Sequence, residues 1–225
     1  MRELAAPLAC VTLLFVLSAA AGGWLVMRHP ELIALFASEQ MINGVQQGNL
    51  WTEGLLNVVP SSILSIGILT NNIVVSLMAF CSGILFGLGT FYIIALNGLM
   101  LGGVFAFVHQ HSMAGKLLEF VMAHGPVELS VICIAGAAGV MLGESLIRPG
   151  LSSRRESFQA ATAKAGRVLF ACALLLVGCG IIEGYVSPNP AFSMTSRVVV
   201  GLGYWVVMVG LLSGRLAGRQ PVRAR

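Results

Sequence analysis

Long apolar runs separated by short polar segments organise the whole chain. Between Glu53 and Lys116 the sequence contains no Asp, Glu, Lys or Arg. A helix needs about 20 apolar residues to cross the hydrocarbon core of a bilayer, so this stretch alone accommodates two crossings. The pattern predicts an all-α, polytopic transmembrane helical bundle of about six spans, with a short or broken third span and an outer interfacial helix. The predicted spans cover residues 4–27, 72–96, 98–112, 126–147, 168–186 and 198–214.

Turn-forming and charged residues set the predicted ends of these spans. The first span ends at Arg28-His29, and an outer interfacial region follows over residues 30–60, whose first part is either an amphipathic helix or a packed linker. Asn97-Gly98 is the predicted turn between the second and third spans. A basic loop, residues 148–167, and a basic tail, residues 215–225, follow the fourth and sixth spans.

The distribution of Lys and Arg orients the predicted bundle, because basic loops stay on the cytoplasmic side. Ten of the 13 basic residues lie in the basic loop, in the basic tail or at Arg2. Only Arg28, Lys116 and Arg197 fall on the opposite side. We therefore expect a multi-pass protein of a bacterial cytoplasmic membrane with both termini in the cytoplasm. Ala19-Ala20-Ala21 also resembles a signal-peptidase site, so cleavage of the first span is the alternative.

Composition agrees with this class and excludes others. Hydrophobic residues make up 57% of the chain and charged residues 10%, whereas about a quarter of the residues of a soluble domain are charged. The net charge of +4 lies in the loop and tail that set topology, so we expect lipid contact and no nucleic-acid binding. Glycines at four-residue spacing allow close approach between helices and predict a tight bundle or a homodimer. The pairs are Gly83 with Gly87, Gly139 with Gly143, and Gly180 with Gly184.

Ionisable and amide side chains within the apolar runs are the candidate functional residues, since each is expensive to place in a membrane. We expect a buried polar cluster, with a structural role or a role in binding an ion or substrate, near the outer face. Capping explains part of it, because Glu128 would be the third residue of a helix that begins at Gly125-Pro126. The candidate cluster residues are His124, Glu128, Glu183, Asn71, Asn72 and Asn97.

No motif for acyl or phosphoryl transfer is present, so we expect no enzymatic activity and no catalytic residue. The five cysteines are scattered through apolar runs without CxxC spacing. We also expect no cofactor and no metal, because the histidines lack a recognised zinc spacing. His124 with Glu128 and Glu183 could nevertheless supply three ligands, and this keeps a metal site open as an alternative.

Seven segments together resemble the stage II sporulation protein M-like family of integral membrane proteins, over roughly residues 60–190. They occur in the order of that family. The segments are Asn71-Asn72, Phe86-Gly87-Leu88-Gly89-Thr90, Asn97-Gly98-Leu99-Met100-Leu101-Gly102, His124-Gly125-Pro126-Val127-Glu128-Leu129, Ala135-Gly136-Ala137-Ala138-Gly139, Ile147-Arg148-Pro149-Gly150, and Ile182-Glu183-Gly184 with Ser187-Pro188.

The resemblance implies a membrane scaffold or assembly subunit that organises other membrane or cell-envelope proteins. The His-Gly-x-x-Glu-Leu element marks the broader, largely uncharacterised branch of the family, so a sporulation role is not carried over. Two alternatives from other classes remain. One is a proton- or ion-coupled transporter or channel-like protein that uses the outer Glu/His cluster, and the other is an intramembrane metal-dependent hydrolase.

Overall fold

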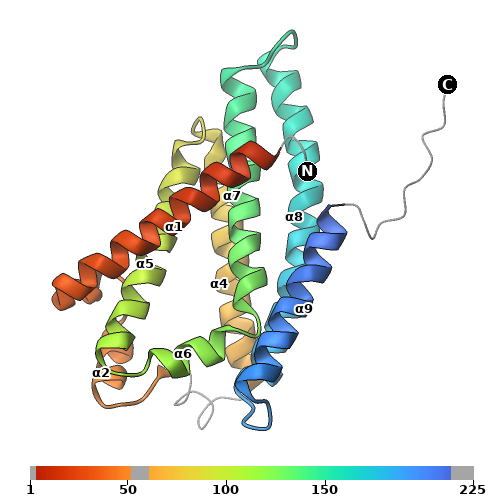
Figure 1. The fold of residues 1–225 in the computed structure, drawn as a ribbon. Helices are drawn as coiled ribbons and strands as arrows, with labels where there is room; N and C mark the ends of the chain where they lie inside the picture. The colour runs from red at the N-terminus through yellow and green to blue at the C-terminus, as the bar shows by residue number, and fades with distance from the viewer. Residues whose placement is uncertain (1–3, 52–60, 214–225) are drawn as a thin grey trace.

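The computed structural model describes residues 4–51 and 61–213, and every regular element in these ranges is a helix (Figure 1). Five helices are long and apolar enough to cross a membrane, and Leu69–Ile84 forms a shorter apolar helix. The predicted helical membrane bundle of about six spans is therefore confirmed. The basic tail, Arg2 and residues 52–60 of the outer region lie outside the described residues. The elements, with η for 3-10 helices, are α1 (Ala5–Arg28), η2 (Pro30–Leu35), α2 (Glu39–Gln46), α4 (Ser61–Cys81), η3 (Ser82–Ile84), α5 (Leu88–Gln110), α6 (Ala114–Val121), α7 (Gly125–Ile147), α8 (Arg154–Tyr185) and α9 (Met194–Leu212).

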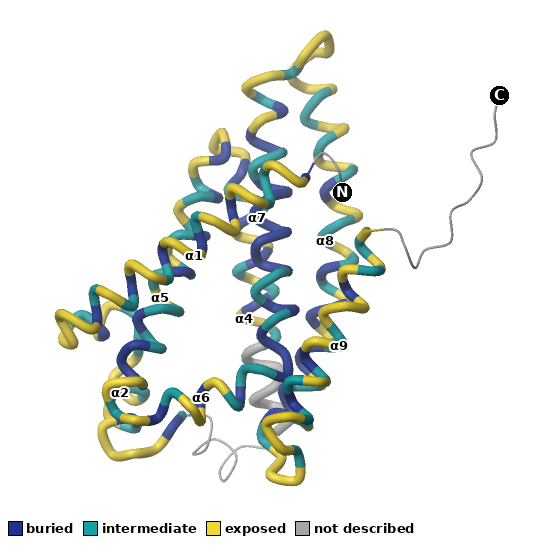
Figure 2. The backbone as a smooth tube through the Cα atoms, in the orientation of Figure 1, coloured by how far each residue is buried: buried dark blue, intermediate teal, exposed yellow. Residues whose placement is uncertain are grey.

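Helix α7 is the core of the bundle. It packs against α1, α4, α5, α8 and α9, and Figure 2 shows it buried along most of its length. In the central stretch of α7, 67% of residues are buried, against 17% in α9. The run Ala135-Gly136-Ala137-Ala138-Gly139 is fully within this core. Such small residues bring neighbouring helices close enough for backbone contact, which drives helix association in lipid.

Helices α1 and α5 cross with their backbones in direct contact. A side-chain carbon on Gly98 would lie 2.6 Å from the Phe15 carbonyl oxygen, and one on Gly102 would overlap the carbonyl of Ala19. The predicted turn at Asn97-Gly98 is therefore wrong, because both residues lie in the middle of α5. Asn97 Nδ2 donates to the Ile93 carbonyl of its own helix at 2.8 Å, so the amide is satisfied without ending the helix.

The break in this part of the chain lies at residues 82–87. The predicted span over residues 72–96 is corrected to α4 with η3, and the predicted short span over residues 98–112 is corrected to the 23-residue helix α5. Gly87 has φ +85°, a left-handed conformation that favours glycine and reverses the chain direction. Thr90 Oγ1 then donates to the Ala79 carbonyl at 2.7 Å in a buried contact. This bond closes the α4–α5 hairpin without any charged residue.

Two of the predicted glycine pairs meet at this hairpin. A side-chain carbon on Gly83 would overlap the backbone of Gly139, and one on Gly143 would overlap the backbone of Gly87. Both contacts join the hairpin to α7. Gly180 and Gly184 are buried in α8.

The outer region is a packed linker between α1 and the rest of the bundle, which was one of the two predicted alternatives. It consists of the short helices η2 and α2 rather than one amphipathic helix. Ser38 caps α2 by accepting a hydrogen bond from the Met41 backbone N–H at 3.3 Å. Ile33 and Val45 are buried against Phe107 and other residues at the end of α5. This small core fixes the lower ends of α1 and α5.

Most of the predicted basic loop is helical. Only residues 148–153 connect α7 to α8, and α8 begins at Arg154 rather than at residue 168. Ser153 and Glu156 form a capping box at its start, which satisfies free backbone N–H groups. The residues that follow, from Ala160 to Gly166, contain good helix formers and no proline. The basic residues from Arg154 onward therefore lie in a helix that continues into the apolar span.

Candidate functional site

The candidate site lies where α7 begins and α8 ends, at the lower end of the bundle in Figure 1. Gly125 and Pro126 open α7, and proline suits the first turn of a helix because no intrahelical partner is needed there. The carbonyl of His124 accepts hydrogen bonds from the backbone N–H groups of Val127 at 3.1 Å and Glu128 at 3.2 Å. His124 and Glu128 are four residues apart and so project from the same face.

Helix α8 brings Glu183 to this face from the opposite direction. His124 Nε2 lies 4.0 Å from Glu128 Oε2 and 4.0 Å from Glu183 Oε1. All three residues are buried, with exposed fractions of 3% for His124, 7% for Glu128 and 1% for Glu183. We call these three residues the outer cluster, after the membrane face that the sequence predicts for them. The structure thus brings together residues separated by more than fifty positions in the sequence.

Three of the four carboxylate oxygens in the outer cluster lack hydrogen-bond partners. Both oxygens of Glu183 and Oε1 of Glu128 are buried without one, and 4.0 Å is too long for a hydrogen bond to the ring of His124. The Asn72 side chain bonds to the Glu128 carboxylate. Asn72 is accordingly the one predicted asparagine that reaches the cluster. Asn71 is exposed, and Asn97 lies in α5 with its amide bonded to its own helix.

The imidazole of His124 is held from its other side. Nδ1 lies 2.9 Å from the Ser187 hydroxyl in a buried contact, and this contact directs Nε2 toward the two glutamates. Burial lowers the pKa of His124, which favours the neutral ring. The Cys179 thiol, one turn before Glu183, lies 3.9 Å from the His124 carbonyl oxygen. Ser187 was not among the residues predicted for the cluster, so its contact with the ring is a finding of the structure.

Ser187, His124 and the glutamates also form a serine, histidine and acid series that sequence spacing did not predict. In this series the serine hydroxyl contacts Nδ1 of the ring, and the carboxylates face Nε2. The carboxylates lie 4.0 Å from Nε2, so neither orients the ring as the acid of a catalytic triad does. Ser187 is itself buried. Its hydroxyl therefore positions the imidazole rather than facing a substrate.

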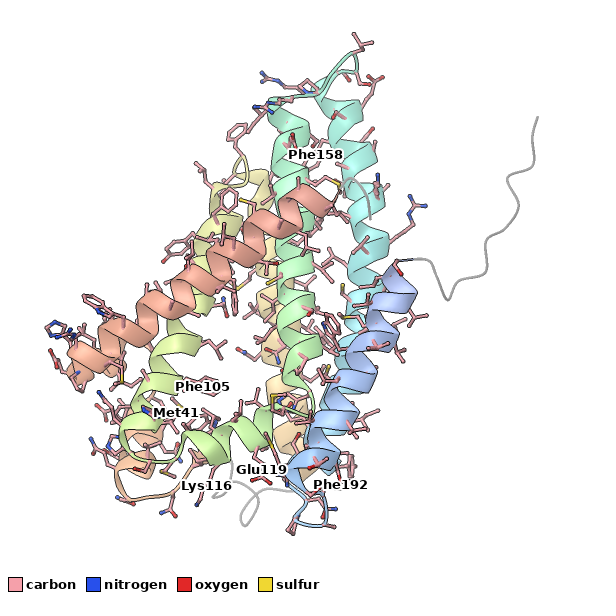
Figure 3. All side chains as sticks on the ribbon, viewed as in Figure 1. Met41, Phe105, Lys116, Glu119, Phe158 and Phe192 are labelled. Atoms are coloured by element: carbon pink, nitrogen blue, oxygen red, sulfur yellow. The ribbon has the colours of Figure 1, made fainter. Side chains whose placement is uncertain are left out.

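A second polar contact ties α6 to α9 beside the site. Arg197 Nη1 pairs with Glu119 Oε1, and Arg197 Nη2 donates to the Asn189 carbonyl at 3.0 Å. Arg197 is buried. Figure 3 places Glu119 at the lower end of the bundle, as it does Phe192 in the α8–α9 loop. In the sequence, Arg197 entered only the distribution of basic residues. Its position shortly after a proline-containing loop was the one signal for a contact with that loop.

The remaining outer histidines do not join the cluster. His111 Nδ1 lies 2.9 Å from the Phe107 carbonyl of its own helix end, and His109 is exposed. Among the described residues, one group of three potential metal-ligating side chains lies with its ligand atoms within 4.8 Å of one another, and this group is the outer cluster. Two carboxylates and a neutral imidazole can bind a divalent cation or share protons.

Comparison with known proteins identifies the chain at the family level. The profile of the family described as Stage II sporulation protein M matches residues 11–188. The match includes α4, α5, α7 and the outer cluster. No curated protein and no solved structure matches the chain significantly.

Proposed function

Since the chain belongs to the stage II sporulation protein M family, we propose that it is a non-enzymatic membrane scaffold that assembles other membrane or cell-envelope proteins. The observation that carries this proposal is the contrast between a fixed core and broad unpartnered faces. The start of α9 is tied to α6 by the Arg197–Glu119 pair, whereas the outward face of α9 is exposed (Figure 2) and carries apolar side chains. The exposed residues include Val199, Leu202, Val206, Val207 and Leu211.

A bulky substitution at Gly203 tests the scaffold role. Gly203 is exposed on α9, and a side-chain carbon there would meet no atom within 4 Å. Gly203→Trp therefore changes the apolar face without disturbing the bundle. Gly166→Trp is the matched control, since Gly166 is equally open but lies in the polar first half of α8.

The assay is affinity capture in mild detergent with partners identified by mass spectrometry. A scaffold that uses α9 should lose the partners of the unmodified chain in Gly203→Trp and keep them in Gly166→Trp. Capture of the same proteins by both variants, or of none by the unmodified chain after crosslinking in intact cells, would contradict the proposal. A homodimer would appear in the same experiment as co-capture of two differently tagged copies.

We propose further that the protein lies in a bacterial cytoplasmic membrane with both termini inside. Arg148, Arg154 and Arg155 lie at the end where α7 meets α8, opposite the end that carries Lys116 and Arg197 (Figure 1), and basic segments stay in the cytoplasm. Reporter domains inserted at Leu151 and at Ala191 test this orientation. A cytoplasm-active reporter should work at Leu151 and an export-dependent reporter at Ala191, and the reverse pattern would refute the proposal.

An ion-coupled transporter is the second candidate, and the buried carboxylate oxygens of Glu128 and Glu183 that have no hydrogen-bond partner favour it. A carboxylate without a partner inside a membrane protein is typical of an ion or proton pathway. Proteoliposomes with an imposed pH gradient or Na⁺ gradient test this function. Ion flux that Glu183→Gln abolishes would replace the scaffold proposal, and flux at the level of empty liposomes would eliminate transport.

A further inference from the structure

We infer that His124, Glu128 and Glu183 bind one divalent first-row transition-metal ion, which joins the start of α7 to the end of α8. The ligand atoms are His124 Nε2 and one oxygen from each glutamate, which lie within 4.8 Å of one another. The inference goes beyond the scaffold function and does not depend on it. It departs from the sequence-based expectation of no metal.

The unpartnered carboxylate oxygens are the first reason. Glu183 is 1% exposed, and neither of its oxygens has a hydrogen-bond partner. Glu128 Oε1 is also buried and unpartnered. A buried carboxylate is costly unless it is paired, hydrogen-bonded, bound to a metal or neutralised by a proton. A cation between them supplies the missing partner for both at once.

The orientation of His124 is the second reason. Metal-bound histidines hold the ring with a hydrogen bond from the other nitrogen, which fixes the tautomer. Here the Ser187 hydroxyl holds Nδ1 at 2.9 Å. When Nδ1 carries the proton, Nε2 presents a free lone pair toward two carboxylates. Either a metal ion or a proton between these three groups would relieve the repulsion among them.

The spacing of the ligands agrees with a small ion after a modest contraction. Zinc–ligand bonds of about 2.0–2.1 Å put the ligand atoms of a tetrahedral site roughly 3.4 Å apart. The two distances from His124 Nε2 to the carboxylate oxygens are 4.0 Å. Side-chain rotations that move the ligand atoms by about 1 Å therefore bring them to the tetrahedral spacing. The imidazole favours zinc and its neighbours in the first transition row over Ca²⁺, which takes six to eight oxygen ligands.

Metal analysis of the purified full-length chain is the primary test. The protein is prepared in detergent without a polyhistidine tag, and metals are counted by inductively coupled plasma mass spectrometry. We expect about one zinc or other transition-metal ion per chain. Glu183→Gln keeps the shape of the side chain but weakens the ligand, and it should reduce the metal content at least about tenfold.

Glu119→Gln is the matched control. Glu119 is also an outer glutamate, but it pairs with Arg197 outside the cluster, so its variant should keep the metal. Equal metal content in Glu183→Gln and the unmodified chain would identify an adventitious ion and overturn the inference. Loss of metal in both glutamine variants would likewise overturn it.

A second measurement uses the unmodified chain alone, so that it does not depend on the folding of any variant. Chelator treatment should lower Tm by about 5 °C or more, and Zn²⁺ should restore it, because a ligand that binds only the folded state stabilises it. Mg²⁺ at the same concentration should not. A metal-free chain whose Tm does not respond to Zn²⁺, with no binding at about micromolar affinity or tighter, would show that the cluster is filled by protons or water instead.

Discussion

Replacing Gly98 by alanine tests the packing that holds α1 against α5. The new carbon would lie 2.6 Å from the Phe15 carbonyl oxygen and 2.8 Å from the Ser18 side chain. The shortest ordinary distance between carbon and oxygen atoms is about 3.3 Å, so the two helices must separate by roughly 0.7 Å. The obstacle at Phe15 is backbone, which no side-chain rotation can remove.

The free-energy change follows from two opposing terms. A gap of about 0.5–1 Å forfeits a quarter to a half of the dispersion attraction between the separated atoms, and overpacking typically costs about 1–3 kcal/mol. Alanine is the better helix former by about 1 kcal/mol. We expect Gly98→Ala to lower the free energy of unfolding by up to about 2 kcal/mol. Gly166→Ala lies in the open part of α8, so it gains helix propensity without any overpacking. It should raise the free energy of unfolding by about 0.5–1 kcal/mol.

The assay is reversible unfolding of both variants and the unmodified chain in the same mixed detergent, followed by circular dichroism. The two substitutions are chemically identical, so the difference of about 2 kcal/mol between them reports the contact with α1. The reasoning is refuted when Gly98→Ala is as stable as Gly166→Ala, because α1 and α5 would then not be in backbone contact at this position.

Three further substitutions have defined outcomes. Thr90→Val keeps the size of the side chain but removes the buried bond to the Ala79 carbonyl, and it should lower the free energy of unfolding by about 1–3 kcal/mol in the same assay. Arg197→Met removes the pair with Glu119 and the bond to the Asn189 carbonyl. It should lower the free energy of unfolding by about 1–3 kcal/mol and speed proteolysis of the α8–α9 loop. The control Arg148→Met, at an exposed site, should change the free energy of unfolding by no more than about 0.5 kcal/mol. Ser187→Ala removes the hydroxyl that holds His124 and should weaken Zn²⁺ binding about 10- to 100-fold in competition with a chelator. Unchanged affinity would show that the ring needs no support from Ser187.

The sequence predicted best those helix ends that carry charge or proline. Arg28 ends α1, and Gly125-Pro126 opens α7, as expected. Within the uncharged stretch, the sequence predicted the turn at Asn97-Gly98, whereas the structure has it at Phe86-Gly87. The choice depends on what each glycine contacts: Gly98 packs on α1, whereas Gly87 adopts the left-handed backbone. Neither property can be read from local sequence.

The outer cluster was predictable in part for a different reason. Ionisable residues are so rare in apolar spans that Glu128, Glu183 and His124 stand out individually, and the four-residue spacing places two of them on one face. The contact between Glu183 in α8 and the two residues at the start of α7 depends on how the helices pack, which local sequence does not determine. The contacts of Ser187 and Arg197 depend on it as well, because serine and arginine near a loop have many ordinary explanations.

The α8–α9 loop connects the two polar contacts at this end of the bundle. Ser187, at its start, contacts the ring of His124, and the carbonyl of Asn189 accepts from Arg197 at the start of α9. The loop is therefore held both by the outer cluster and by the Glu119–Arg197 pair. A metal ion bound by the cluster, as inferred above, would contact the same imidazole ring that Ser187 contacts. Because α9 carries the proposed partner face and begins just after this loop, the outer cluster is placed to set the position of the helix that partners would contact.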